Sequence, residues 1–510
     1  MNSEHQGLTT TQLRYRTGLT PAHAYRYRRR GETALTTRHR LRKTKVIATI
    51  GPACDDENTL REMIVAGMNV ARLNLSHGDL ETHDERLTKV RRVAEAVQAN
   101  IAIMVDTRGC EIRTGVVDGG AIELKRGQQF ALHADDRIGS VDGVSVSHKT
   151  LYEHVKPRER VLLDDGLMEL RVTAIEDRVV RCRVESGGTL RNNKGVNLPD
   201  NPGVLDGLDS HSDDDLQFAA SHDVEYIAAP FVRSAKDVER IQEKLKAFNA
   251  EIPIIAKIEN HSGVDNLNEI IAVADGTMVA RGDLGVELGM ARGPTIQKRI
   301  IRTTVTNGKP VITATQMLDS MERTPRPTRA EVSDVANAIL DGTSAVMLSG
   351  ETAVGAYPIE AVRTMVALSL EAEAGLHEYG HLQQILPHPS HVVTEAVAQA
   401  AITMANHLEA AAIISLTETG FTSRLISKYR PDCLILAVTS ALPVVRRLAM
   451  NWGVSPVHYE GDGSDEDKIQ FAIRHAKQLD HVQTGDVIVV TAGHVRQAGS
   501  TDMIRVLTVD

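Results

Sequence analysis

The pattern of apolar and polar residues divides the chain into repeating units. From about Lys45, short apolar runs alternate with segments in which apolar residues recur at helical spacing. The eight apolar runs are residues 46–50, 69–73, 101–105, 224–229, 254–256, 276–280, 311–314 and 345–348. The helical segments between them include residues 82–97, 235–248, 264–274, 296–306 and 330–340. This alternation predicts an α/β fold with a parallel sheet, and eight units are the number that closes a (β/α)8 TIM barrel.

Two further regions show their own patterns of apolar residues. Between about residues 114 and 203, strand-like alternation replaces the helical spacing, and Asp-Gly and Gly-Gly pairs mark turns. A β-rich insertion in a barrel loop is well placed to act as a lid. After a polar stretch at residues 380–391, the apolar runs 411–416, 433–438 and 486–492 alternate with helices. This last pattern predicts a second α/β domain with an open sheet.

These patterns predict four parts of the chain. We expect a basic N-terminal extension at residues 1–43, and a barrel formed by residues 44–113 and 204–378. The lid is expected at residues 114–203 and a C-terminal regulatory domain at residues 392–510. With 510 residues and 42% hydrophobic content, the chain can bury several ordinary cores.

Composition narrows the class of protein. No apolar run approaches membrane-spanning length and no apolar signal-peptide core follows the N-terminus, so we expect a soluble cytoplasmic protein without membrane contact. The four cysteines are widely spaced and form no C-x-x-C pair: Cys54, Cys110, Cys182 and Cys433. Their spacing fits reduced thiols better than a disulfide framework or a zinc site.

The charge is distributed unevenly. Net charge is −9, but residues 1–43 carry ten basic and two acidic residues, a net of +8, which leaves −17 for the remainder. We expect this stretch to be a flexible extension, because it lacks apolar periodicity. A nucleic-acid-binding or targeting arm is the alternative, because Tyr15, Tyr25 and Tyr27 could stack on bases, although nothing else in the sequence supports it.

The stretch 254–285 is the centre of the predicted chemistry. It has the pattern of one β-α-β unit whose strands end in charged clusters, Lys257 with Glu259 and Arg281 with Asp283. In a parallel sheet both carboxylates emerge at the same edge. Two carboxylates beside a lysine suit Mg²⁺ and an anionic substrate such as a phosphate or carboxylate. The alternative interpretation is that both clusters are solvated loop charges.

Unusual residues follow every predicted strand, which places the site at the carboxyl face of the barrel. In chain order, the characteristic segments are TKVIATIGPA, GMNVARLNLSHG, DTRGCEIRTG, LLDDGLMEL, NNKGVNLP, KIENHSGVDN, VARGDLGVEL, QKRII, GKPVITATQMLDSM, PRPTRAEVSDVANAILDGTSAVMLSGETA and YPIEAV. On these motifs, residues 43–510 resemble the pyruvate kinase family. VARGDLGVE and TATQMLDSM are long enough to be highly specific.

The resemblance implies an architecture and a reaction. The family has a (β/α)8 barrel with an inserted β-barrel lid domain and a C-terminal α/β open-sheet domain, and is usually a homotetramer. Its members transfer a phosphoryl group from phosphoenolpyruvate to ADP, giving pyruvate and ATP in the last step of glycolysis. Such a reaction depends on positioning two polyanions and neutralising their charge.

The resemblance also implies roles for the strand-end residues. Glu259 and Asp283 would hold Mg²⁺, or Mn²⁺, while Lys257 would stabilise the transferring phosphoryl group. Arg72 would bind the substrate phosphate, although an isolated arginine after a strand is more often a surface ion pair. Backbone N–H groups at Gly282 and Asp283 would bind the substrate carboxylate.

A second set of residues is implied for the enolate that remains after phosphoryl transfer. Thr315 is similar in position to the family residue near the substrate carbon. It would relay a proton from water rather than supply its own, because a threonine hydroxyl is a poor acid. Glu351 belongs to the same rim and would order that water. Without the resemblance, both would be interpreted as strand-end polar residues.

Further residues resemble the monovalent-cation and nucleotide sites of the family. The all-oxygen set expected to hold K⁺ is Asn74, Ser76, Asp106 and the Thr107 carbonyl group, and Glu111 indicates potassium dependence. The residues expected to contact nucleotide phosphates are Asn74, Leu75, Ser76, His77, Arg113 and Lys194. From the sequence alone, Lys194 is more readily interpreted as a solvated turn lysine.

The sequence also departs from the family pattern. Arg108 and Cys110 replace the usual lysine and proline, Cys54 stands where serine is common, and Pro230 replaces a serine. We expect Cys54 and Cys110 near the active-site rim. The expected effector loop comprises Thr417, Thr419, Gly420, Thr422 and Ser423. Glu418 and Phe421 disfavour tight fructose 1,6-bisphosphate binding there, which leaves a sugar monophosphate, AMP or no activator.

Two alternative functions remain open from the sequence. Another metal-dependent barrel enzyme acting on a pyruvate enolate, such as an aldolase or phosphomutase, would need the carboxylates but not Arg113 or the potassium set. A binding protein that grips RNA with its basic arm would not need the charged residues of the barrel. Nucleic acid is therefore not expected as a partner.

Overall fold

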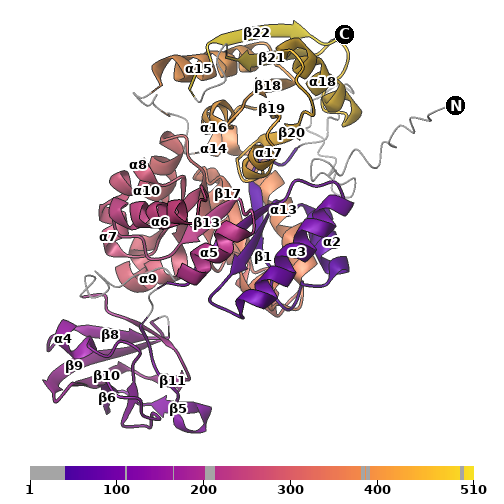
Figure 1. Ribbon diagram of the computed structural model, residues 1–510. Helices are drawn as coiled ribbons and strands as arrows, with labels where there is room; N and C mark the ends of the chain where they lie inside the picture. The colour runs from indigo at the N-terminus through magenta and orange to yellow at the C-terminus, as the bar shows by residue number, and fades with distance from the viewer. Residues whose placement is uncertain are drawn as a thin grey trace.

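The computed structural model describes residues 41–109, 112–164, 166–200, 213–380, 385, 391–493 and 499–510. The predicted flexible extension up to residue 40, Cys110, Glu111 and nearly all of the 380–391 linker lie outside the described residues. Figure 1 shows three bodies arranged in a row, with the lid at one end of the barrel and the C-terminal domain at the other.

Eight parallel strands form the closed barrel, which confirms the predicted fold class. They are β1 (Lys45–Thr49), β2 (Val70–Asn74), β3 (Ala102–Asp106), β13 (Tyr226–Ala229), β14 (Ile254–Ile258), β15 (Gly276–Ala280), β16 (Val311–Ala314) and β17 (Ala345–Leu348). Their order around the barrel follows the order along the chain. The strands are almost wholly buried because helices cover their outer face, which explains their uninterrupted apolar runs.

The outer layer consists of helices, most of which pack apolar side chains on the strands. They are α2 (Glu57–Ala66), α3 (Leu80–Ala96), α5 (Asp213–Ser221), α6 (Ala235–Ala247), α7 (His261–Asp265), α8 (Leu267–Val273), α9 (Arg281–Leu288), α10 (Gly293–Thr306), α11 (Arg329–Leu340), α12 (Gly350–Ala353), α13 (Pro358–Ala374) and α14 (Leu376–Tyr379). The predicted single helix near residues 264–274 is divided at Asn266, whose side-chain amide donates to the Arg233 carbonyl at 2.8 Å.

The lid is a mainly antiparallel sheet in which only the β6–β7 pair is parallel among the described strands. Its order is β4-β12-β8-β9-β10-β6-β7, with β5 and β11 forming a separate pair. The strands are β4 (Ile112–Arg113), β5 (Ala121–Leu124), β6 (Gln129–His133), β7 (Gly143–Ser145), β8 (Arg160–Leu163), β9 (Met168–Glu176), β10 (Val179–Ser186), β11 (Gly188–Arg191) and β12 (Gly195–Asn197), with one short helix, α4 (Leu151–His154). The edges β4 and β7 are joined by N–H donation from Ser147 to the Arg113 carbonyl and from Gly115 to the Ser145 carbonyl, each 2.8 Å. The sheet is therefore barrel-like, as predicted.

The C-terminal domain has a five-stranded open sheet in the order β20-β19-β18-β21-β22, with only the β21–β22 pair antiparallel. The strands are β18 (Ala412–Leu416), β19 (Leu434–Thr439), β20 (Val454–His458), β21 (Val487–Ala492) and β22 (Met503–Thr508). The helices are α15 (Val392–His407), α16 (Phe421–Lys428), α17 (Leu442–Leu448) and α18 (Asp465–Gln478). Two apolar clusters cover its two faces, as the predicted open sheet requires.

The C-terminal domain closes the amino-terminal end of the barrel. Met450, which follows α17, is fully buried among inward-facing barrel residues such as Ile47 and Met104. The Tyr226 hydroxyl donates to the Arg447 carbonyl at 2.7 Å, and Lys45 Nζ donates to the Val454 carbonyl at 2.8 Å. The carboxyl end of the barrel, on the lid side, is therefore the end left for chemistry.

The first described residues take part in this junction. Arg42, grouped above with the extension, donates to the Asn69 side chain at 2.7 Å, and Lys43 Nζ donates to the Asp432 carbonyl at 2.8 Å. These two cations are thus part of the packed structure.

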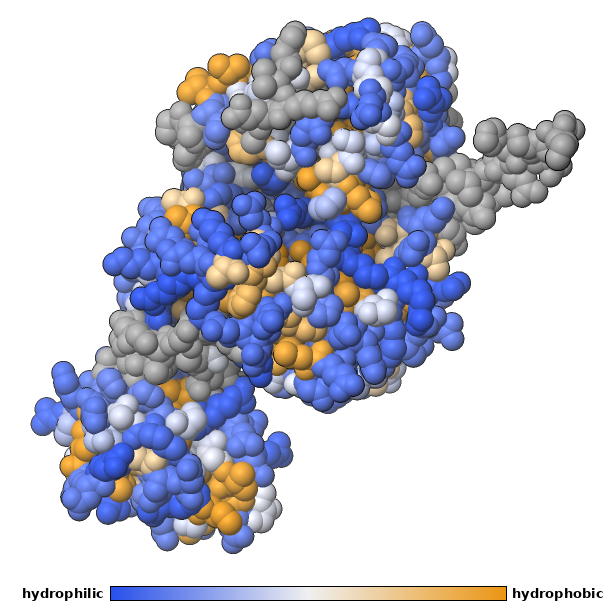
Figure 2. Space-filling model, in the orientation of Figure 1, coloured by the Kyte–Doolittle hydropathy of each residue, from blue (hydrophilic) through white to orange (hydrophobic). Residues whose placement is uncertain are grey.

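The outer surface is predominantly hydrophilic on the face shown in Figure 2, with small scattered hydrophobic patches. Among the described residues, none of the helices has the length and apolar character that crossing a membrane requires.

Replacing Met450 tests the contact between the C-terminal domain and the barrel. We expect Met450→Ala to lower the free energy of unfolding by about 2–5 kcal/mol, because it removes a fully buried side chain and leaves a cavity. Urea denaturation followed by circular dichroism measures this loss. The control is Met290→Ala, since that side chain is 80% exposed. Equal stability of the two variants would contradict the packing described here.

Candidate active site

Parallel register brings residues from distant parts of the sequence to one mouth of the barrel. Asn74 and Asp106 are paired across β2 and β3, and Arg72 lies opposite Thr49 across β1 and β2. Lys257 and Glu259 stand at the end of β14, while Asp283 lies in the first turn of α9, directly after β15. The structure thus brings the predicted site residues of the barrel to the same end.

Lys257 is the centre of a buried ion-pair network. Its ammonium Nζ lies 3.2 Å from Asp106 Oδ1 and 3.0 Å from Glu259 Oε1, and the lysine side chain is only 14% exposed. Asp106 Oδ2 also accepts from Arg72 Nε at 2.8 Å. Arg72 Nη1 in turn donates to the Thr49 hydroxyl at 2.9 Å, so both cations have fixed directions.

The network keeps these groups charged despite their burial. Burial alone would lower the pKa of Lys257, but the carboxylates of Asp106 and Glu259, and more weakly Asp283, raise that pKa above its usual value. Burial likewise favours the neutral form of Asp106, while Lys257 and Arg72 outweigh it and hold the Asp106 pKa below its usual range. At neutral pH, a concentrated group of charged side chains therefore lies at the lid end of the barrel.

Glu259 is fixed through both oxygens. Oε1 pairs with Lys257, and Oε2 accepts the Phe231 backbone N–H at 2.7 Å. Phe231 has a φ of 50°, in the left-handed region, and follows Pro230, so this departure from the family pattern lies in the loop that holds Glu259. A side chain at Gly109 would come within 2.7 Å of the Phe231 ring, which explains why glycine stands there.

The donor set suits a hard divalent ion that is shared with a substrate. Among the residues that the structure describes, no group of three or more His, Cys, Asp or Glu side chains could hold a metal. Glu259 and Asp283 follow two neighbouring strands, and Mg²⁺ typically takes one or two protein carboxylates and completes its shell with water and substrate oxygens.

Thr315 directly follows β16, at the same end of the barrel as Glu259 and Asp283. Its hydroxyl accepts the Gly282 N–H at 2.9 Å and donates to the Ala314 carbonyl at 2.6 Å. One of the two backbone groups predicted to bind a substrate carboxylate, the Gly282 N–H, is thus directed at Thr315.

The predicted potassium and nucleotide residues occupy neighbouring loops. The Asn74 side-chain oxygen accepts the Ser76 N–H at 3.3 Å, and the Leu75 N–H donates to the Asp106 carbonyl at 3.0 Å. Thr107 is buried and follows Asp106 at the end of β3. The His77 carbonyl contacts His83 Nε2 at 2.8 Å, which fixes the end of this loop.

The two predicted nucleotide contacts near the lid have protein partners. Lys194 Nζ lies 2.8 Å from Asp164 Oδ1, so this lysine is paired rather than a freely solvated turn residue. Arg113 Nη1 donates to the Asn193 carbonyl at 3.1 Å. Both cations belong to the strands and turns where the lid joins the barrel.

Sequence reasoning missed one buried carboxylate at this junction. Asp215, in the first turn of α5, is fully buried and accepts the Arg108 backbone N–H at 2.8 Å and Arg108 Nε at 2.9 Å. Arg108 follows the proposed potassium residue Thr107, so Asp215 holds the loop that leads into the lid. The only sequence signal was an acidic run, Asp213–Asp215, which is also typical of an ordinary helix start.

Two other predicted rim residues are buried. Glu351 accepts backbone N–H groups from Leu318 at 3.0 Å and Ser349 at 2.7 Å, so its carboxylate joins the ends of β16 and β17. Cys54 Sγ lies 3.7 Å from the Thr49 carbonyl and has no exposed surface. Burial raises the pKa of Cys54 to about 11, which makes it a poor nucleophile.

Most hydroxyl groups of the expected effector loop form hydrogen bonds within the domain. The Thr417 hydroxyl accepts the Gly420 N–H at 2.9 Å, and the Thr422 hydroxyl bonds that of Thr501. Ser423 donates to the Ser415 hydroxyl at 3.0 Å, and the Thr419 carbonyl accepts Arg424 Nη1 at 3.2 Å. Lys468, which the sequence did not single out, lies 3.5 Å from Glu418.

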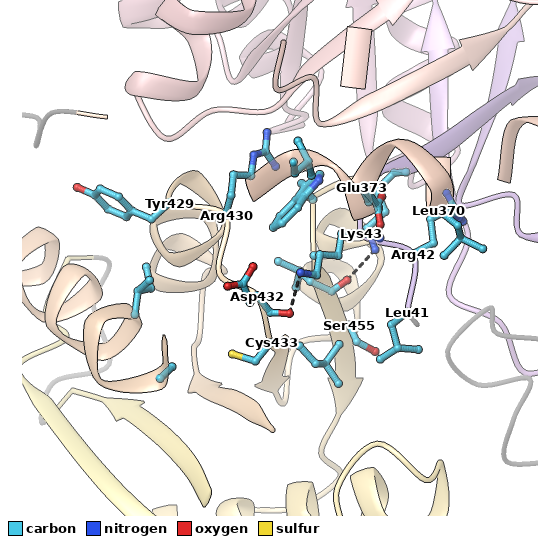
Figure 3. A pocket seen from close by; sticks show the side chains of 18 of the residues that line it. Leu41, Arg42, Lys43, Leu370, Glu373, Tyr429, Arg430, Asp432, Cys433 and Ser455 are labelled. Atoms are coloured by element: carbon cyan, nitrogen blue, oxygen red, sulfur yellow. Dashed lines mark hydrogen bonds between the residues drawn. The ribbon is translucent and has the colours of Figure 1, made fainter. Parts of the chain in front are cut away.

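A large cavity lies away from this chemistry. About 1280 Å³ in volume, it is lined by residues of the amino-terminal barrel end and the C-terminal domain, including Lys43, Glu373, Arg430 and Cys433. Figure 3 shows these side chains around the cavity, with Lys43 directed at the backbone carbonyl of Asp432. Because it lies at the opposite end of the barrel from Lys257, this cavity is not the candidate active site.

Comparisons with known proteins agree with this geometry. A family model described as "Pyruvate kinase, barrel domain" matches residues 41–362, and one described as "Pyruvate kinase, alpha/beta domain" matches residues 395–507. The chain is 45% identical to a pyruvate kinase of Bacillus licheniformis, over 92% of this chain and 81% of that protein. It is 44% identical to a pyruvate kinase of Clostridium acetobutylicum, over 92% of this chain and 100% of that protein.

Removing the charge of Asp106 tests the network. We expect Asp106→Asn to lower the free energy of unfolding at pH 7 by about 3–5 kcal/mol, because Lys257 and Arg72 lose a buried partner. Since the folded pKa of Asp106 lies below its unfolded value of about 3.9, its contribution is present above that pH and is lost as pH falls through the folded pKa.

The measurement is urea denaturation of both proteins from pH 7 down to pH 3. The stability difference should stay constant above about pH 5 and shrink below about pH 4. Asp319→Asn, a carboxylate whose side chain is 48% exposed, is the control and should change stability much less. A difference that does not depend on pH would show that Asp106 is not held ionised by its partners.

Proposed function

The chain belongs to the pyruvate kinase family, and from this premise we propose that it transfers the phosphoryl group of phosphoenolpyruvate to ADP, giving pyruvate and ATP. The observation that carries the proposal is the buried network of Lys257, Arg72, Asp106 and Glu259 at the open mouth of the barrel. Such a site can neutralise an anion in transfer, because fixed charges in a partly dry site need no rearrangement during the reaction.

We assign the divalent ion, Mg²⁺ or Mn²⁺, to Glu259 and Asp283. The fit is supported by hard carboxylate oxygens at the ends of two neighbouring strands, one of them held in place by the Phe231 N–H. When bound, the ion supplies positive charge to the phosphoryl oxygens. Lys257 lies 3.0 Å from Glu259 and would hold the phosphoryl group as a compact point charge.

Arg72 and Thr315 would act at the two ends of the substrate. Arg72 is oriented by Asp106 and Thr49, so its remaining guanidinium edge can bind phosphate oxygens. Thr315 would place a water near the enolate carbon, where a solvent proton is taken up to form the methyl group of pyruvate. Both oxygens of Glu351 accept backbone N–H groups, which fixes this carboxylate at the rim, and its remaining lone pairs would order that water.

The monovalent ion is proposed to be K⁺, bound by oxygens of Asn74, Ser76, Asp106 and Thr107. The support is the pairing of Asn74 with Asp106 across adjacent strands and the position of Ser76 and Thr107 directly after them. Nucleotide phosphates would contact the adjoining loop through residues 74–77, together with Arg113 and Lys194. Lys194 would then exchange its partner Asp164 for a phosphate oxygen.

Regulation and assembly are proposed from the family. We expect a homotetramer that works in the cytoplasm. The effector loop is expected to bind a sugar monophosphate or AMP, or no activator, since its hydroxyl groups are engaged internally and Glu418 adds a negative charge.

A coupled assay for pyruvate and ATP tests the function. With Mg²⁺, K⁺ and phosphoenolpyruvate, we expect turnover only when ADP is present. Glu259→Gln should lower kcat by about 10²–10³-fold and weaken the apparent affinity for Mg²⁺, because it removes a metal carboxylate and a partner of Lys257.

Glu239→Gln, an exposed change on the outer helix α6, is the matched control and should leave kcat unchanged. Consumption of phosphoenolpyruvate without ADP, with no ATP formed, would contradict the proposed kinase and favour another barrel enzyme acting on a pyruvate enolate.

A further inference from the structure

The chain takes up an uncommon backbone conformation where Thr315 stands. Thr315 and Gln316 have φ values of 69° and 53°, both in the left-handed region, directly after β16. A β-branched residue such as threonine adopts this region rarely, because its side chain then crowds the backbone. Such a turn persists only when its surroundings hold it in place, and such turns cluster at functional sites.

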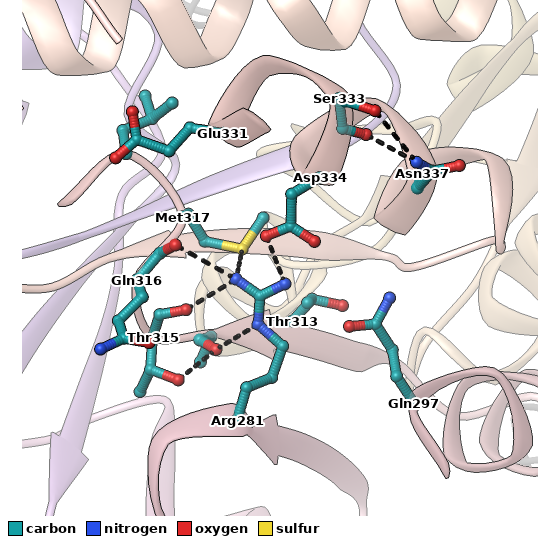
Figure 4. Close-up of polar contacts among 12 residues, drawn as sticks. Arg281, Gln297, Thr313, Thr315, Gln316, Met317, Glu331, Ser333, Asp334 and Asn337 are labelled. Carbon is teal, nitrogen blue, oxygen red and sulfur yellow. Dashed lines mark hydrogen bonds and ion pairs between the residues drawn. The ribbon is translucent and has the colours of Figure 1, made fainter. Parts of the chain in front are cut away.

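The side chain of Arg281 holds this turn in place. Its guanidinium donates from Nε to the Ala314 carbonyl at 3.2 Å, and from Nη2 to the Thr315 carbonyl at 2.7 Å. The same Nη2 lies 3.4 Å from the Gln316 carbonyl, so one planar group reaches three successive carbonyls of the turn. Figure 4 shows the guanidinium directed into the concave side of this turn.

Asp334 of α11 fixes the direction of the guanidinium. Its Oδ2 accepts from Arg281 Nη1 at 2.5 Å, on the edge that does not contact the turn. The side chain of Arg281 is 19% exposed and that of Asp334 is 39% exposed, so this pair is partly screened by solvent. The pair therefore serves orientation more than stability.

The backbone next to Arg281 completes the link to chemistry. Gly282, the following residue, donates its N–H to the Thr315 hydroxyl at 2.9 Å, while Ala280 and Ala314 are paired across β15 and β16. The start of α9 therefore contacts the turn twice, through the Arg281 side chain and the Gly282 backbone. A shift of the turn would move the Thr315 hydroxyl.

We propose that Arg281, oriented by Asp334, is a positioning residue that holds the left-handed turn at Thr315 and thereby sets the rate of proton transfer to the substrate carbon. The inference rests on the proposed function. In that step the carbon–carbon π pair of the enolate takes a proton from solvent water, whose O–H bond breaks to leave hydroxide in the solvent, and an oxygen lone pair forms the carbonyl of pyruvate. Arg281 touches no reacting atom and acts only through Thr315.

The reverse of this step can be followed without phosphoryl transfer. In D₂O, an enzyme that moves a proton at this carbon exchanges the methyl protons of pyruvate for deuterium, and proton NMR measures the rate. Arg281→Lys keeps a charge facing Asp334 but cannot span three carbonyls. Asp334→Asn keeps the guanidinium and frees its direction.

With Mg²⁺ and K⁺ present, we expect both variants to slow methyl exchange and kcat, Arg281→Lys by about 10²-fold, because a displacement near 1 Å can cost that much. The KM for phosphoenolpyruvate should stay within about twofold of wild type. The control is Arg323→Lys, which should match wild type. Arg323 is an exposed residue of the loop that follows β16, and it pairs with Asp319 rather than with the turn at Thr315.

Circular dichroism and the melting temperature confirm that each variant is folded. Exchange within twofold of wild type in both folded variants would overturn the inference, as would a rise in KM at unchanged kcat. If wild-type protein neither forms ATP nor exchanges pyruvate protons, the proposed function itself fails, which distinguishes that failure from loss of the positioning role.

Discussion

An ammonium group buried between two carboxylates is the interaction on which the rest of the structure depends. Unit charges about 3 Å apart attract by about 5 kcal/mol at an effective dielectric constant of 20, which is comparable to the several kcal/mol lost when each ion leaves water. Lys257 therefore needs both Asp106 and Glu259 close by, with Arg72 balancing the second carboxylate oxygen of Asp106. The curvature of the barrel brings the ends of β2, β3 and β14 together at one mouth.

The rest of the molecule maintains that arrangement. The C-terminal domain fills the amino-terminal mouth with Met450, so solvent and substrate reach the network from the lid side. Asp215 holds the loop into the lid, while Glu351 and Arg281 hold the turns after β16 and β17. Polar side chains that hydrogen-bond to backbone atoms thus fix the loops in place, as expected where a rigid scaffold presents flexible segments.

Much of the fold follows from local pattern. The runs at residues 276–280, 311–314 and 345–348 coincide with β15, β16 and β17, because strands covered on both faces must be continuously apolar. Likewise, the charged strand ends could be assigned to one face, since parallel strands in a barrel share a direction. Division of the helix at Asn266 was not predictable, because it depends on a bond to Arg233, far away in the sequence.

The partners of the site residues could not be predicted for the same reason. Lys194 pairs with Asp164 and Arg108 with Asp215, and neither pairing leaves a local signal in the sequence. Nor could the sequence show that Cys54 is buried beneath the rim. Side-chain pairing across the barrel is a property of the assembled fold, whereas strand and helix periodicity is a property of each segment.

The most direct measurement is the rate of ATP formation from phosphoenolpyruvate and ADP, followed by phosphorus NMR, for wild-type protein and for Lys257→Met. We expect ATP resonances to grow with wild-type protein, and at a rate lower by about 10³-fold or more with a variant that circular dichroism shows to be folded. A folded Lys257→Met protein that forms ATP within tenfold of the wild-type rate would contradict the central role of the buried ammonium group.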